Sequence, residues 1–275
     1  MVARTLLTGW MVLLGAAASA QTPAQIGQLT KARQAYNQGQ YEQAITAALD
    51  ARRAPALALT ATVVLGRAYI ERFAATADGA DLALAHGALA GLDPTRLTPN
   101  DRRDLTIGLG LTVFLEGRPG AAAELLEVAL AAPADADPRA REKLFDWWAT
   151  AVDRAAQLAP DSGRRRYYRR IMERSESELA RDPLCTAAGY WLAASARGAG
   201  EFDRAWDAAI AAWIRAKQTP ALGNARDEST DARAQIDLLV SAAIIPERAR
   251  ALDARAAQAL IAAMRAEWEQ IKNSW

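Results

Sequence analysis

Arginines, tyrosines and acids are the residues of this chain that could do chemistry, because the usual catalytic and metal-binding types are scarce. His86 is the only histidine and Cys185 the only cysteine among 275 residues. A zinc site takes several His or Cys ligands, so the composition argues against a zinc enzyme, and one cysteine forms no intramolecular disulfide. We also find no Gly-x-Ser-x-Gly, no phosphate loop with lysine and no His-Glu-x-x-His. We therefore expect no cofactor and no catalysis. A carboxylate pair assembled by the fold would leave no motif, so a hydrolase stays as a distant alternative.

Polar side chains recur at matched places in two neighbouring segments near the N-terminus. Arg33 and Arg67 are 34 residues apart; Tyr36 and Asn37 share the helix face of the first, and Glu71 that of the second. Arginines stacked in this way could bind a carboxylate of a partner in bidentate fashion. The alternative is that both arginines are solvated or pair with acids of the same chain.

Further candidates lie later in the chain. Tyr190 and Arg197 occupy the corresponding helix face of a later segment, and the stretch between carries the apolar Ile107, Leu111, Phe114 and Leu115. An apolar groove could hold a partner helix, or these side chains could pack within the chain.

Two other patterns have both a functional and a structural interpretation. The basic stretch 164–170 contains Tyr167 and Tyr168, and could bind an anionic polymer or a membrane surface. Its tyrosines fall on one helix face with Ile171, however, which is typical of an ordinary amphipathic helix. The tryptophans could stack on sugars, but their helical spacing favours packing in the core of this alanine-rich chain.

The elements that must position these residues are repeated helical hairpins. Three segments align without gaps around Gly39, Gly117 and Gly200. Glycine ends a helix well because it adopts the left-handed conformation without a Cβ penalty. Small residues stand seven before, five after and twelve after each glycine, where they let two antiparallel helices approach closely. They are Ala32, Gly110 and Ala193; Ala44, Ala122 and Ala205; and Ala51, Ala129 and Ala212.

A fourth copy, Leu65-Gly66-Arg67-Ala68-Tyr69, begins 34 residues after the first, which is the period of the tetratricopeptide repeat (TPR). The chain resembles that family over roughly 24–132 and 186–217. The resemblance implies an all-α fold, a right-handed α-solenoid of antiparallel helix hairpins with no sheet. It also implies a groove, lined by the first helix of each hairpin, that binds a protein or peptide partner. The chain departs from the family at Pro119, where an aromatic is usual, and at 75–81, where we expect an irregular turn.

The remaining segments complete the predicted domain, 21–275. We expect helices over 139–158 and 164–181 with a turn at 159–163 between them, and a loop at 219–224. Helices over 229–243 and 246–273, with a break near Asp253, close the chain; solenoids need such atypical terminal units, so 228–275 is expected to cap the array.

The first twenty residues read as a signal for export. Arg4 precedes an apolar stretch of about ten residues, and Ala18-Ser19-Ala20 is a small-x-small cleavage site; the alternative is an anchor that is kept. We expect cleavage after Ala20 and a periplasmic or secreted protein of a bacterium, with no integral membrane segment in the mature chain. Without Arg4 the 33 basic residues become 32, against 32 acidic ones, and this balance gives no reason to expect nucleic acid.

The leading functional hypothesis is a non-catalytic scaffold or adaptor for proteins of the bacterial envelope. The alternative is a helical protein that binds a small ligand or a glycan through its tryptophans. On the first hypothesis we expect an Arg33→Ala, Arg67→Ala variant to fold normally and to lose its partners, because exposed charges contribute about 0–1 kcal/mol to stability.

Overall fold

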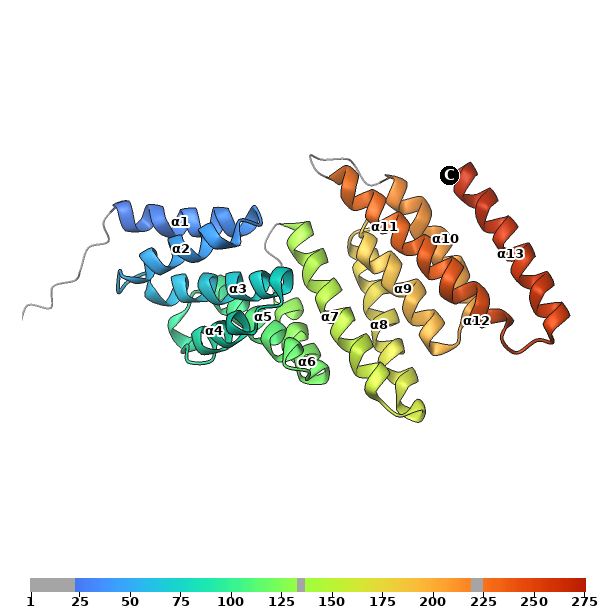
Figure 1. Ribbon diagram of the computed structural model, residues 1–275, viewed down its shortest axis with the longest axis horizontal. Helices are drawn as coiled ribbons and strands as arrows, with labels where there is room; N and C mark the ends of the chain where they lie inside the picture. The colour runs from blue at the N-terminus through green and yellow to red at the C-terminus, as the bar shows by residue number, and fades with distance from the viewer. Residues whose placement is uncertain (1–22, 133–136, 219–224) are drawn as a thin grey trace, which may run out of the picture.

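The computed structural model describes residues 23–132, 137–218 and 225–275, and helices make up nearly all of them (Figure 1). The expected signal and the loop at 219–224 lie outside the described residues. Within the described part no strand occurs, so the all-α prediction is confirmed. The helices are α1 (Pro23–Asn37), α2 (Tyr41–Arg52), α3 (Ala58–Thr76), α4 (Gly79–Leu89), the 3-10 turn η1 (Pro94–Arg96), α5 (Pro99–Leu115), α6 (Pro119–Ala131), α7 (Pro138–Leu158), α8 (Asp161–Arg181), α9 (Thr186–Ala199), α10 (Phe202–Gln218), α11 (Ala225–Leu239), the π turn η2 (Val240–Ile244), α12 (Ile245–Ala249) and α13 (Ala254–Ser274).

Consecutive helices pack as hairpins, and the hairpins stack into an elongated solenoid with α1 at one end and α13 at the other (Figure 1). The pairs are α1 with α2, α3 with α4, α5 with α6, α7 with α8, and α9 with α10. The first helices of neighbouring hairpins also touch one another in sequence: α1 and α3, α3 and α5, α5 and α7, α7 and α9, α9 and α11. We call these six helices the first-helix layer, because each one touches the next.

The three glycines that align in the sequence each end a first helix in the left-handed conformation. The φ angles are 73° at Gly39, 81° at Gly117 and 81° at Gly200. The amide that follows each glycine bonds back to a carbonyl of the helix's last turn, at 2.9, 3.1 and 2.9 Å. These bonds satisfy carbonyls that the helix end would otherwise leave free.

The small residues at fixed distances from these glycines lie where the helices approach most closely. Ala32, Ala44 and Ala205 are fully buried. A Cβ built on Gly110 would stand 2.9 Å from Leu126 on the paired helix α6, closer than real Cβ contacts. Larger side chains at these positions would push the two helices of a hairpin apart. The prediction that these small residues allow close helix packing is therefore confirmed.

The second hairpin differs from the expected irregular turn over 75–81. Helix α3 has 19 residues, against 15 in α1 and 14 in α9, so it extends about one turn further. Ala77, at φ 57°, takes the left-handed place that glycine fills elsewhere. Asp78 then caps α4, its carboxylate accepting the Ala80 amide at 3.0 Å. The turn is therefore short and regular, and only its position is shifted.

Two other predicted boundaries are wrong. Helix α8 begins at Asp161, so the predicted turn contributes its last residues, including Gly163, to the helix. Helix α11 does not stop before Pro246 but continues through the π turn Val240–Ile244 into α12. Pro246 has no backbone N–H to donate within the helix. The π turn changes the hydrogen-bond pattern just before this proline, so the helix can continue through it. The predicted break near Asp253 is confirmed, since that residue caps α13.

Candidate functional site

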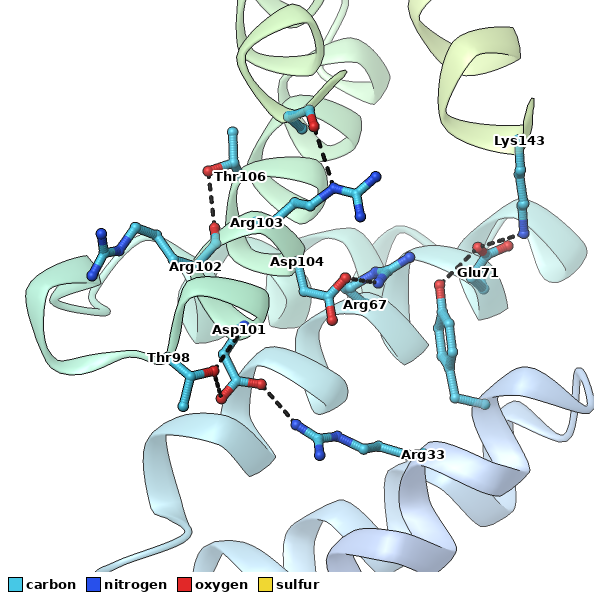
Figure 2. Close-up of polar contacts among 12 residues, drawn as sticks. Arg33, Arg67, Glu71, Thr98, Asp101, Arg102, Arg103, Asp104, Thr106 and Lys143 are labelled. Atoms are coloured by element: carbon cyan, nitrogen blue, oxygen red, sulfur yellow. Dashed lines mark hydrogen bonds and ion pairs between the residues drawn. The ribbon is translucent and has the colours of Figure 1, made fainter. Parts of the chain in front are cut away.

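Two acids of α5 bind the two predicted arginines. Arg33 of α1 pairs with Asp101 at 2.7 Å, and Arg67 of α3 pairs with Asp104 at 2.6 Å (Figure 2). The predicted residues are thus brought together, and the alternative in which the arginines pair with acids of their own chain is the one observed.

Asp101 is the most enclosed member of this arrangement. Its side chain is 4% exposed, near the N-terminal end of α5. Besides Arg33 it accepts the hydroxyls of Thr60 and Thr98, both at 2.8 Å. Arg33 itself is half exposed, so it neutralises a buried acid while part of its guanidinium faces water.

Arg67 is largely enclosed, with 15% of its side chain exposed. Its guanidinium lies 4.9 Å from the centre of the Tyr36 ring, a cation–π distance. Burial alone would lower the pKa of Arg67, but Tyr36, Asp104 and Glu71 more than compensate and raise it. Arg67 is therefore part of the packing between α1, α3 and α5, and it pairs with an acid of its own chain.

Glu71 of α3 connects the N-terminal helix α1 with α7, which lies further along the solenoid. Its carboxylate accepts the Tyr36 hydroxyl at 3.1 Å and pairs with Lys143 of α7, also at 3.1 Å (Figure 2). Burial is the largest cause that raises the pKa of Tyr36, and Glu71 raises it further. One carboxylate thus ties together α1, α3 and α7.

A small cavity opens beside these groups. It has a volume of about 160 Å³ and room for a few atoms of a ligand, since a water molecule occupies about 30 Å³ in the liquid. Asn37 is exposed in its wall. The lining residues are Arg33, Tyr36, Asn37, Val63, Val64, Arg67 and Asp104.

A second, larger cavity of about 400 Å³ lies further along the first-helix layer, between α7, α9 and α11. Tyr190 lies in its wall, as one of the predicted residues. Arg197 does not; it lies two turns further along α9 and pairs with Glu247 of α12 at 2.7 Å. The lining residues are Arg139, Glu142, Lys143, Asp146, Thr186, Ala187, Tyr190, Asp231, Ala232 and Gln235.

The sequence did not single out the two acids of α7 in this wall. Glu142 accepts the Thr186 hydroxyl at 2.7 Å and the Ala187 amide at 2.8 Å, so it caps α9 from outside. Asp146 accepts the indole N–H of Trp191 at 2.8 Å. Burial raises the pKa of Asp146, the Trp191 bond opposes this, and Glu142 raises it further. The spacing of these two acids, four residues apart on one helix face, was the sequence signal that could have identified them.

The remaining candidate patterns have structural roles. Ile107 and Leu111 are buried in the core, with Phe114 and Leu115 partly buried against it, so this stretch offers no open apolar groove. On the basic helix α8, Tyr168 and Ile171 face the core, as the amphipathic interpretation predicts.

Most of the tryptophans also belong to the core. The buried ones are Trp148, Trp191, Trp206, Trp213 and Trp268. Ring pairs among the described residues are tilted or edge-on, so no exposed parallel pair offers a platform for a sugar there.

Neither metal nor membrane features occur in the described part of the chain. Its His, Cys, Asp and Glu residues form no group of three that could hold a metal ion. None of its helices is long and apolar enough to cross a bilayer.

Comparison with protein-family models, with curated proteins and with solved structures gives no match to this chain.

Proposed function

We propose that this protein binds an extended segment of another polypeptide along the first-helix layer and catalyses no reaction. One observation carries the proposal: the polar groups of the two cavities are connected. Lys143 lines the larger cavity and pairs with Glu71, which holds Tyr36 in the wall of the smaller one. A path of polar and aromatic side chains that crosses several helices suits a chain-like ligand better than a single small molecule.

The proposed setting is the bacterial envelope, with the protein as a scaffold or adaptor. Its support is the signal-like sequence of residues 1–20 and the resemblance of the helical repeats to TPR proteins. Sequencing the N-terminus of the mature protein tests the setting: we expect it to begin at Gln21. An intact Met1 in a cytosolic fraction would contradict export.

Site-specific photo-cross-linking in intact cells tests the binding face. A photoreactive residue at Asn37, exposed in the wall of the smaller cavity, should give a discrete adduct with a partner protein. The same group at Glu173, exposed on α8, serves as the control and should give none. Equal adducts at both positions would show that the binding is not specific to this face. No adduct at Asn37 would show that no partner binds there.

A small-ligand function is the second candidate, and the volume of the larger cavity favours it, since ligand pockets span about 300–1,000 Å³. The glycan version loses its support with the burial of the tryptophans. The two candidates differ in ligand length: affinity should grow with peptide length only if the ligand is a chain.

A further inference from the structure

The larger cavity has acids in its wall that form no ion pair within the described part of the chain. We propose that it binds a basic side chain, lysine or arginine, of the bound polypeptide. This inference rests on the proposed function and names the chemistry that the site would recognise.

Two carboxylates in the cavity wall, those of Glu142 and Asp146, are held in place by hydrogen bonds to α9. No ion pair among the described residues includes Glu142 or Asp146. Each uses one oxygen, Oε1 or Oδ1, for its bonds to α9; Oε2 and Oδ2 accept none of the hydrogen bonds made within the described part. Two oriented acceptors are therefore available to a ligand.

The basic residues of the same wall are already engaged. Lys143 pairs with Glu71 at 3.1 Å and lies 4.7 Å from the centre of the Trp147 ring. Arg139 makes an interaction of its own. Asp231 adds a third acid from α11, so the wall has acids on two of its three helices.

Tyr190 supplies an aromatic surface beside these acids. It is half-buried in the cavity wall, and its ring is fixed edge-on to Trp191, at 5.4 Å and 82°. An ammonium or guanidinium group is attracted to both a carboxylate and the face of a tyrosine ring. A cation here would also offset the unfavourable burial of the Asp146 charge.

The cavity suits a side chain better than a bare ion. The described residues offer no cluster of metal ligands, and about 400 Å³ is far more than one ion fills. Lys143, which lines this cavity, pairs with Glu71 and so connects the cavity with the polar groups of the smaller one.

The test uses the mature chain and capped single amino acids as probes: N-acetyl-arginine N-methylamide and its lysine and norleucine equivalents. Binding is followed by the NMR signal of the Trp191 indole N–H, which Asp146 accepts and which therefore reports on the cavity even for millimolar affinities. We expect the basic probes to bind at least about tenfold more tightly than norleucine, the effect of one favourable charged contact.

Asp146→Asn should weaken binding of the arginine probe about tenfold and leave norleucine unchanged. Asp207→Asn, the same change at an exposed acid of α10, is the matched control and should have no effect. Equal binding of norleucine, or an unchanged affinity in Asp146→Asn, would overturn the proposal. If free arginine binds tenfold more tightly than the capped probe, the ligand is a small amine and not a polypeptide, which would also overturn the proposal. Failure here with retained cross-linking at Asn37 would leave the proposed function standing.

Discussion

At the scale of single residues, folding buries the carboxylate of Asp146, and this burial is unfavourable when the carboxylate is ionised. Burial raises its pKa, and the nearby Glu142 adds to this; Tyr190 is the titratable group that faces it from α9. When the folded pKa of an acid lies above the unfolded value, the folded state binds more protons between the two. Stability therefore falls as pH rises through that window and stays lower above it.

Removing this charge should stabilise the protein. Asn at position 146 can still accept the Trp191 indole N–H, so Asp146→Asn should melt at a higher temperature than the wild type at about pH 8. The difference should vanish at about pH 3, below the ordinary range of carboxyl groups. Thermal melts by circular dichroism across pH measure this, with Asp207→Asn as the control that should show no gain. A lower melting temperature at neutral pH would mean that the charge itself stabilises the fold.

Arg33 is half exposed, but its partner Asp101 is buried, so Arg33 should contribute to stability. Arg33→Ala leaves Asp101 buried with two threonine hydroxyls and no cation. A hydrogen bond to a charged group contributes about 1.5–3 kcal/mol, so a loss of that size is expected in urea unfolding. This replaces the expectation that the double arginine variant folds normally. In the Asp101→Asn background the same substitution should cost clearly less; equal costs in both backgrounds would show that the pair is not coupled.

What the sequence revealed at this scale depended on matched positions. Arg33 and Arg67 could be found because they are one repeat apart. Their acids could not, since Asp101 and Asp104 belong to the third hairpin, 68 and 37 residues away along the chain. Nothing in a single sequence states which acid a folded chain brings to which arginine.

At the scale of the helices, some glycines lie where two helices touch and others face open space, and one of each kind allows a test. A Cβ on Gly66 of α3 would stand 2.5 Å from Leu89 of α4, which is itself buried. A Cβ on Gly87 of α4 would meet nothing within 4 Å.

Alanine should therefore have opposite effects at the two positions. Gly66→Ala overpacks the helix contact and should destabilise by about 1–3 kcal/mol. Gly87→Ala gains only helix propensity and should stabilise by about 0.5–1 kcal/mol. Urea unfolding of both variants measures the difference. Stabilisation by both would show that α3 and α4 can separate without cost, against the role assigned to the small residues.

Helix positions followed from the sequence where residue type decides them. Gly39, Gly117 and Gly200 mark their turns because they have the left-handed backbone that glycine favours. The end of α3 was missed because Ala77 takes that conformation without a telling residue type. The join at Pro246 was missed because the π turn that lets the helix continue past the proline has no telling residue type.

At the scale of the whole molecule, the solenoid has an end that needs cover. Helix α13 lies at one extremity (Figure 1). Its Trp268 packs against the rings of Trp206 and Trp213 on α10, with centroids 6.0 and 5.4 Å apart, and donates its indole N–H to Asp237 of α11 at 2.6 Å. Without α13 those two tryptophans would lose the ring that covers them.

Deleting residues 254–275 should therefore make the protein aggregate and lower its unfolding midpoint. A repeat array transmits stability only between neighbours, so an uncovered last unit frays first and exposes its apolar face. The point variant Trp268→Ala should cost about 3–5 kcal/mol, the usual range for emptying a buried aromatic site. Deleting Trp275 alone, which is 53% exposed, should change neither quantity. Light scattering and urea unfolding measure both. A truncated chain that stays monomeric with an unchanged midpoint would show that α13 is an appendage; in that case the free surface of α10 would itself become the place to look for a partner.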